Sequence, residues 1–134
     1  MSVWQRVAHG GYSALLAALK PVYLVRLWWR GRREPLYRHA MGERVGAYGG
    51  NSTAGCVWVH AVSLGETRAA AALINALRAV RPDMRLLLTH STATGREAGE
   101  TLLNPGDCQV WLPYDTPGAV NRFFQQFRPR VGVL

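Results

Sequence analysis

A serine, a glycine and a glutamate lie together where a predicted strand gives way to a predicted helix. Residues 56–61 form an apolar run typical of a buried strand, and residues 65–80 carry leucine and isoleucine at helical spacing. Ser63, Gly65 and Glu66 occupy the junction between them. Ligands of open α/β sheets bind beyond the carboxyl ends of the strands. A carboxylate placed there can take a proton from an attacking hydroxyl group, as a general base does.

Glu66 also has a structural explanation. In the pattern Ser63-x-x-Glu66 the serine hydroxyl accepts a hydrogen bond from the amide of Glu66, and the carboxylate reaches back to the amide of Ser63. A carboxylate in the first turn of a helix is also favoured by the helix dipole. The pattern alone favours such a capping box, and the role of general base is the functional alternative.

Further polar residues follow the other predicted strands. If these strands are parallel, their carboxyl ends meet at one edge of the sheet, and the polar residues there form a hydroxyl-rich set suited to a phosphorylated or sugar ligand. The alternative roles are hydrogen-bonded structural histidines and caps of the following helices. The candidate ligand contacts are His60, Ser63, Gly65, His90, Ser91, Thr92, Thr94 and Asp115.

Several kinds of site are not indicated. Cys56 and Cys108 are the two cysteines, and we expect both to be buried thiols. Neither forms part of a Cys/His pattern typical of zinc, and the sequence holds no Walker motif and no Gly-x-Gly-x-x-Gly. We therefore expect no metal and no cofactor in this chain.

Residues 55–134 alternate between short apolar runs and helical patterns. Strands that are apolar throughout, each followed by a helix, predict an α/β fold with a Rossmann-like parallel sheet covered on both faces. The chain stops within its last predicted strand, so we expect a fragment of a longer protein or a truncated product. Strands are predicted at 56–61, 85–89, 109–112 and 130–134, and helices at 65–80, 94–103 and 115–127.

The N-terminal segment holds most of the excess positive charge. The net charge is +8, and residues 1–50 contain eight of the 16 Lys and Arg but two of the eight acids. Residues 12–33 read as a helix that either spans a membrane or lies on its surface, and the flanking arginines would keep the rest of the chain in the cytoplasm. Basic residues beside aromatics suit a membrane better than nucleic acid.

We divide the chain into a membrane anchor at 1–35, a glycine-rich linker at 36–54 with one short helix near 37–44, and a Rossmann-like domain at 55–134.

Several stretches, in order along the chain, resemble the 3-deoxy-D-manno-octulosonic acid (Kdo) transferases, which add Kdo sugars to the lipid A precursor of Gram-negative bacteria. Trp58 to Glu66 is similar to their first strand and catalytic turn, and Leu88 to Gly95 to their second strand and loop. The other matching stretches are Tyr23-Leu-Val-Arg-Leu-Trp-Trp-Arg30, Glu43-Arg44-Val45-Gly46 and Leu112-Pro-Tyr-Asp115.

This resemblance implies the N-terminal half of a GT-B glycosyltransferase, in which two Rossmann-like halves face each other across a cleft. It implies that this half, preceded by a membrane-associated helix, binds the lipid A precursor (lipid IVA), and that the other half binds the donor CMP-Kdo. Transfer would be inverting, without a metal, at the cytoplasmic side of the cell inner membrane. Glu66 matches the family's proposed general base. The donor half is missing from this chain, so we expect the fragment to be inactive alone.

Two other functions remain open. One is a membrane-anchored Rossmann-like module that binds a lipid or a phosphosugar without catalysis, in which case changing Glu66 would leave function intact. The other is a GT-B glycosyltransferase with another acceptor or donor, such as the enzyme that makes lipid II. The glycine-rich phosphate loops expected in that enzyme after the first strand are absent here.

Overall fold

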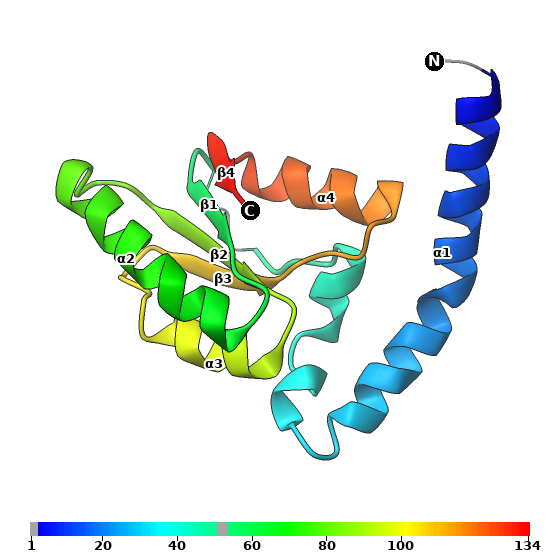
Figure 1. Cartoon of the computed structure of the whole chain (residues 1–134), viewed down its shortest axis with the longest axis horizontal. Coiled ribbons are helices and arrows are strands. Elements are labelled where there is room, and N and C mark those ends of the chain that lie inside the picture. Colours follow the sequence, from blue (N-terminus) through cyan, green and yellow to red (C-terminus); the bar gives the residue numbers. More distant parts are fainter. Residues whose placement is uncertain (1–2, 51–53) are drawn as a thin grey trace.

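A parallel sheet of four strands forms the centre of the protein (Figure 1). The structure is a computed structural model that describes the backbone of residues 3–50 and 54–134; residues 1–2 of the predicted anchor and 51–53 of the predicted linker lie outside the described residues. The strands are β1 (Val57–His60), β2 (Leu86–His90), β3 (Cys108–Trp111) and β4 (Val131–Val133). All four predicted strands and the α/β class are confirmed.

The strand order is β3-β2-β1-β4. The chain runs outward from β1 to β3 and then returns to pair β4 with the other side of β1, so the order reverses at β1. In doubly wound sheets the crevice at such a reversal, beyond the carboxyl ends of the strands, is where ligands bind. The loop that follows β1 therefore occupies the favoured position for a site.

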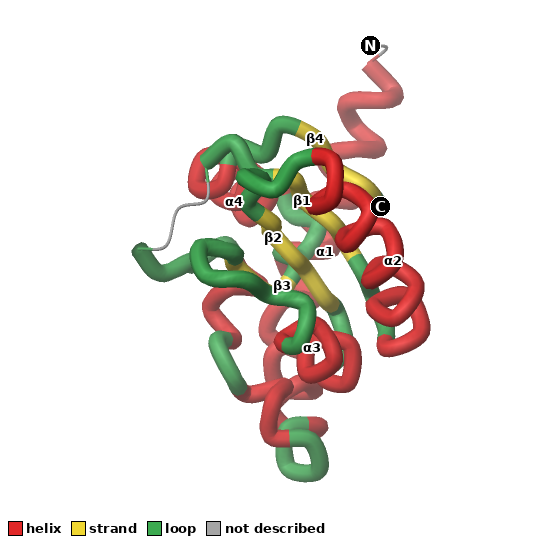
Figure 2. Tube along the Cα trace, turned by 90° about the vertical axis from the view of Figure 1, so that its left-hand side faces the viewer, coloured by secondary structure: helices red, strands yellow, loops and turns green. Residues whose placement is uncertain are grey.

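Helices cover the two faces of the sheet. α2 (Leu64–Val80) and α3 (Ala93–Glu100) lie on one side, and α4 (Pro117–Phe127) lies on the other (Figures 1 and 2). Side chains of β2 alternate between the two layers, as a strand requires. Leu86 and Leu88 pack with Ile74 of α2, whereas Leu87 packs with Phe123 of α4.

β4 departs from the prediction that every strand is buried. Val131 and Val133 are 51% and 37% exposed, whereas every residue of β2 is buried. β4 is an edge strand that pairs with β1 alone among the described residues.

α1 (Val3–Arg30) is longer at its N-terminal end than the predicted helix at 12–33, and it contains Pro21. A proline inside a helix removes a backbone hydrogen bond, and Figure 1 shows the helix bending along its length. The rings of Tyr23 and Tyr114 meet edge to face, with their centroids 5.3 Å apart, so α1 packs beside the loop after β3. Among the described residues, no helix combines the length and the apolarity that crossing a membrane would require. Membrane association of α1 stays a prediction.

The segment predicted as a linker is packed against the sheet. It contains two short 3-10 helices, η1 (Pro35–Arg38) and η2 (Met41–Val45), where the sequence indicated one short helix. Glu43 forms a 3.1 Å ion pair with Arg96 of α3 and accepts a 2.8 Å hydrogen bond from the amide of Trp111. The Trp111 indole donates to the carbonyl of His39 at 2.7 Å. These contacts hold residues 39–45 at the carboxyl end of β3, and the domain boundaries stay predictions.

Candidate active site

Ser63 begins α2 as its N-cap. The backbone is extended there (φ −124°, ψ 174°), and the serine hydroxyl accepts a long hydrogen bond, 3.5 Å, from the amide of Glu66. The carbonyl of Ser63 accepts a 2.8 Å bond from the hydroxyl of Thr67. The serine half of the predicted capping box is thereby confirmed, and it places Glu66 in the first turn of the helix.

The carboxylate half of the capping box is wrong. Glu66 Oε2 accepts a 2.7 Å hydrogen bond from the amide of Val62, and not from that of Ser63. Because the backbone is extended at Ser63, the amide of Val62 lies within hydrogen-bonding distance of the Glu66 carboxylate. The Glu66 side chain is exposed, and its second carboxylate oxygen has no hydrogen-bond partner among the described residues. One oxygen is thus anchored, and the other is available to a ligand.

Gly65 has no packing reason to be a glycine. A Cβ placed there would have one neighbour within 4 Å, the Ser63 hydroxyl at 4.0 Å. Glycine within a helix costs about 0.5–1 kcal/mol relative to alanine. The bare backbone leaves open space directly beside Glu66, where another molecule can approach closely.

Val62 joins the loop after β1 to the loop after β2. Its carbonyl accepts hydrogen bonds from the Thr92 hydroxyl at 2.8 Å and from the Thr92 amide at 3.1 Å. Thr92 also caps α3 by accepting a 3.3 Å bond from the amide of Gly95. A Cβ at Gly95 would lie 3.1 Å from the Ser63 backbone, so glycine permits this close approach. The carboxyl ends of β1 and β2 are held together by these contacts.

His60 lies near this junction and is half-buried. Its Nδ1 donates to the carbonyl of Thr89 at 3.2 Å and lies 2.9 Å from the Thr89 hydroxyl. Burial lowers the pKa of His60, while the hydrogen bond to Thr89 and the charge of Glu66 oppose this in part. Burial therefore favours the neutral imidazole, whose Nδ1 side is fixed by Thr89.

His90 sits inside the protein. It has no exposed surface; its Nδ1 donates to the carbonyl of Ala61 at 2.8 Å, and its Nε2 lies 2.9 Å from the side-chain amide of Gln109. Burial lowers the pKa of His90 despite these hydrogen bonds. This geometry gives His90 a structural role, bridging β1, β2 and β3, and its predicted contact with a ligand stays a prediction.

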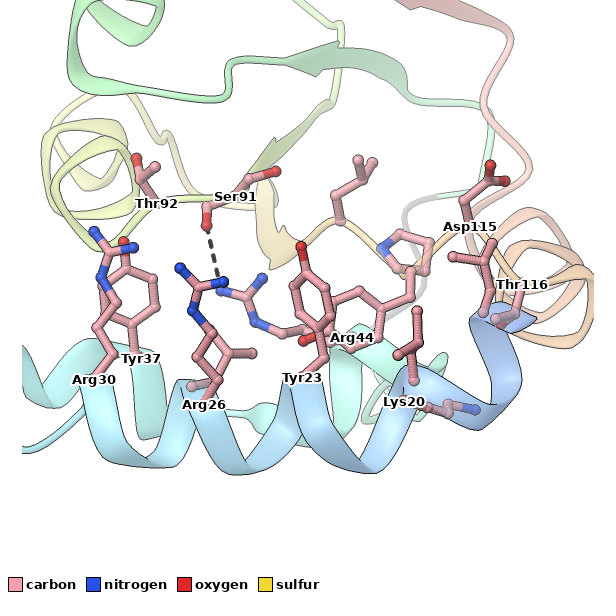
Figure 3. Close-up of a pocket in the computed structure, with 16 residues that line it drawn as sticks. Lys20, Tyr23, Arg26, Arg30, Tyr37, Arg44, Ser91, Thr92, Asp115 and Thr116 are labelled. Atoms are coloured by element: carbon pink, nitrogen blue, oxygen red, sulfur yellow. Dashed lines mark hydrogen bonds between the residues drawn. The ribbon is translucent and has the colours of Figure 1, made fainter. Parts of the chain in front are cut away.

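A cavity of about 510 Å³ lies between α1 and the carboxyl edge of the sheet (Figure 3). Of the predicted residues, Ser91, Thr92 and Asp115 line it. Glu66 does not, and lies across the Val62–Thr92 contact from it. Thr94 is exposed on α3 and is not part of the lining. The predicted residues therefore divide between the junction that carries Glu66 and this cavity.

The sequence interpretation missed most of the cavity. Its walls combine apolar side chains of α1, such as Leu16 and Leu27, with cations of the predicted membrane anchor and linker. Arg26 and Arg30 are four residues apart and so share one face of α1, a spacing that could have suggested a common target. The described residues contain no group of three or more His, Cys, Asp or Glu able to hold a metal ion. The basic residues of the lining are Lys20, Arg26, Arg30 and Arg44.

Comparison with known proteins identifies one family. Residues 39–134 match the family described as 3-deoxy-D-manno-octulosonic-acid transferase (kdotransferase). The chain is 44% identical over 137 residues to the 3-deoxy-D-manno-octulosonic acid transferase of Bordetella pertussis, covering 96% of this chain and 32% of that protein. It is 29% identical over 128 residues to the transferase of the same name from Haemophilus influenzae, covering 92% of this chain and 29% of that protein.

A plant protein is also similar. The probable mitochondrial 3-deoxy-D-manno-octulosonic acid transferase of Arabidopsis thaliana is 31% identical over 124 residues, covering 92% of this chain and 28% of that protein. The chain thus spans about a third of the length of these relatives. No solved structure shows significant similarity to it.

Proposed function

This chain belongs to the Kdo transferase family, and from that premise we propose that it forms the acceptor-side half of a GT-B glycosyltransferase that moves Kdo from CMP-Kdo to the lipid A precursor. The parallel sheet in the order β3-β2-β1-β4 supports a Rossmann-like half. The donor would bind to a second half, of the kind that the remaining two thirds of the relatives can supply. We call this chain together with that second half the complete protein.

The observation that carries the proposal is the position of Glu66. It follows β1, where the strand order reverses, with one carboxylate oxygen held by the Val62 amide and the side chain exposed beside the bare backbone of Gly65. A carboxylate fixed in this way is oriented to accept the proton of an acceptor hydroxyl. Positioned general bases of this kind contribute about 10²–10⁴-fold to a rate.

The reaction follows from this placement. The acceptor oxygen forms a bond to the anomeric carbon of Kdo, and the hydroxyl proton passes to Glu66. The bond from that carbon to the phosphate oxygen of CMP breaks, and its electron pair leaves with CMP. Attack from the face opposite the leaving group inverts the configuration. Because a phosphate is a good leaving group, one base suffices, and no metal or cofactor is assigned.

The neighbouring polar groups would orient the substrates. His60, whose neutral form is favoured by burial, presents its Nε2 side because Thr89 occupies Nδ1. Ser63 keeps the helix start in place, and its hydroxyl is engaged with the Glu66 amide. Ser91 and Thr92 carry the loop between the Glu66 junction and the cavity. We assign these residues to acceptor binding and positioning and not to proton transfer.

The cavity beside α1 suits an amphiphilic acceptor. Its wall on α1 carries Leu16, Leu19 and Leu27 next to basic residues, and Asp115 is the one acidic residue among the described residues that line it. A lipid with a charged, sugar-based headgroup presents the matching surfaces: acyl carbons toward leucines and anionic groups toward cations.

α1 would also hold the protein at the cytoplasmic side of the inner membrane. Its cavity side packs on the domain, whereas Leu15, Val22, Val25 and Trp29 are 58%, 62%, 61% and 65% exposed. These residues recur at intervals of seven, three and four, so they form one apolar stripe along the helix. A helix packed on one side and apolar on the other lies along a membrane surface, where its arginines meet anionic headgroups.

The direct test is a transfer assay with defined substrates. The complete protein, supplied with CMP-Kdo and the lipid A precursor lipid IVA, is expected to release CMP and form a Kdo-bearing lipid. This chain alone is expected to form none. Binding of the lipid by the complete protein without any transfer would favour a binding module, and transfer of another sugar or to another acceptor would favour a different glycosyltransferase.

A further inference from the structure

Arg44 is a buried cation that pairs with no carboxylate among the described residues. Its side chain lies over the ring of Trp111, with Cζ 4.1 Å from the ring centroid, and the residue is 4% exposed. Its one hydrogen bond runs from Nη2 to the carbonyl of Ser91 at 3.4 Å, and Nε is buried with no partner. The adjacent carboxylate, Glu43, is taken by Arg96 and by the Trp111 amide.

A buried arginine of this kind costs free energy unless a counterion or a hydrogen-bond acceptor pairs with it. Burial disfavours an unpaired charge, and buried donors without acceptors are rare in folded proteins. Arg44 lines the cavity beside α1, so a partner can reach it from there. Burial lowers the pKa of Arg44, and the nearby charge of Glu43 offsets this only in part. The guanidinium therefore has hydrogen-bonding capacity that no described residue of the chain uses.

Two more guanidinium groups share this end of the cavity. Figure 3 shows Arg26 and Arg30 reaching from α1 toward the loop of Ser91 and Thr92, with Asp115 at the opposite end. Arg30 rests on the ring of Tyr37, with Cζ 4.7 Å from the ring centroid. Neither Arg26 nor Arg30 pairs with a carboxylate among the residues that the structure describes. Like charges thus converge at this end of the cavity, and none of the three arginines is paired with a carboxylate of the described residues.

We propose that Arg26, Arg30 and Arg44, which we call the arginine cluster, bind a phosphomonoester group on the acceptor lipid. A phosphomonoester carries close to two negative charges and three acceptor oxygens, so it can satisfy several guanidinium groups at once. The planar guanidinium group of arginine can donate two parallel hydrogen bonds to two phosphate oxygens at once. The leucines of α1 that line the same cavity would contact the apolar part of the same molecule.

This inference rests on the proposed function, because it divides the acceptor between two places. The reacting hydroxyl would lie at Glu66, and the phosphate would lie across the Val62–Thr92 contact, in the cavity. Holding a charged group away from the reacting atom fixes the orientation of the acceptor, which is the contribution that substrate-positioning residues make to a rate. The arginine cluster would thus be a positioning and specificity site.

The test measures binding without any sugar donor. The chain is titrated calorimetrically at constant ionic strength with dihexanoyl phosphatidic acid, dihexanoyl phosphatidylcholine and inorganic phosphate. Phosphatidic acid is expected to bind, phosphatidylcholine not to bind, and inorganic phosphate to bind more weakly because it lacks the apolar part. Arg44→Gln and Arg26→Gln are each expected to weaken phosphatidic acid binding by about tenfold or more, the loss typical of a hydrogen bond to a charged group.

Arg33→Gln is the matched control. Arg33 is exposed, lies three residues after the end of α1 and does not line the cavity, so its loss removes the same charge outside the site. Its effect on binding is expected to stay below about twofold, since surface charges act weakly at this range. A loss equal to that of Arg26→Gln would reduce the cluster to general charge attraction and overturn the proposal.

Other outcomes also decide. Unchanged phosphatidic acid binding in Arg26→Gln and Arg30→Gln rejects the site even if Arg44→Gln fails to fold, because both residues are exposed on α1. Equal affinity for inorganic phosphate and phosphatidic acid rejects the lipid as the source of the phosphate. Lost binding in the variants, together with a complete protein that transfers no Kdo, would keep this site and reject the proposed function.

Discussion

The carboxylate of Glu66 accepts a 2.7 Å hydrogen bond from the backbone amide of Val62. The carbonyl of Val62 in turn accepts bonds from the amide and hydroxyl of Thr92, which lines the cavity beside α1. A single residue thus orients the candidate base and links it to the place where we propose that the acceptor binds. Displacement of either loop would move both parts of the site together.

Two glycines should respond in opposite ways to alanine. Gly65→Ala is expected to leave the free energy of unfolding unchanged or to raise it by up to about 1 kcal/mol, because a Cβ there meets open space. Gly99→Ala should lower it by about 1–3 kcal/mol, because the new Cβ would overlap the side chains of His90 and Gln109. Urea unfolding measures both. Marked destabilisation by Gly65→Ala would mean that the fold, and not a ligand, requires this glycine.

Glu43 should be essential to the attachment of η2. In Glu43→Gln the buried guanidinium of Arg96 loses its carboxylate, and breaking one side of a buried ion pair typically costs about 3 kcal/mol. The control is Glu97→Gln on α3, an exposed glutamate, for which a change within about 0.5 kcal/mol is expected. Chemical denaturation gives the comparison. Equal stability of the two variants would show that the packing of this segment does not depend on the pair.

Stability should fall with pH below the ordinary pKa of histidine, 6.5. Burial lowers the pKa of His90 and of His60, so between the folded-state pKa and 6.5 the unfolded chain binds more protons than the folded one. Stability is then complete above about pH 6.5 and declines as pH decreases through that window. Urea unfolding at several pH values measures this slope. His90→Asn should flatten it and exposed His9→Asn should not; identical slopes in all three proteins would contradict the assignment.

The outer face of α1 should govern membrane binding. Replacing Val22 and Val25 by serine removes two exposed apolar side chains, each worth about 1.5 kcal/mol when buried, so partitioning into anionic vesicles should fall by about tenfold per valine. Val80→Ser is the matched control, because Val80 is 78% exposed but lies at the end of α2, away from the outer face of α1. Vesicle sedimentation measures the partitioning. Undiminished binding by the double variant would place the membrane contact elsewhere.

The sheet could be predicted because its signals are local. Each strand is a short apolar run, and the observed bounds agree with the predicted ones to within one residue at every strand end; β1, for example, is predicted at 56–61 and spans Val57–His60. The Ser63 cap was also readable, since the serine and Glu66 are three residues apart. The edge position of β4 depends on which strands pair, which a local pattern does not contain.

The packing of residues 36–54 and the cavity could not be predicted for the same reason. Glu43 and Arg96 are 53 positions apart, and Trp111 and His39 are 72 apart, so neither contact leaves a periodic trace. Glycines and charges made this segment resemble a linker, although Tyr37 is 2% exposed in its folded environment. Arg44 likewise looks like a surface charge in the sequence, because the Trp111 ring that it packs against is distant along the chain.

The most direct test of the central claim is Kdo transfer by the Glu66→Gln variant of the complete protein, measured with CMP-Kdo and the lipid A precursor beside its melting temperature. Glutamine keeps an acceptor for the Val62 amide, so the variant should fold, and turnover should drop by about 10²–10⁴-fold because the base is lost. Glu97→Gln is the matched control, because it makes the same replacement at an exposed glutamate of α3 outside the site; it should leave both the turnover and the melting temperature nearly unchanged. A folded Glu66→Gln protein with near-normal turnover would contradict the account and leave Glu66 as part of the helix start alone.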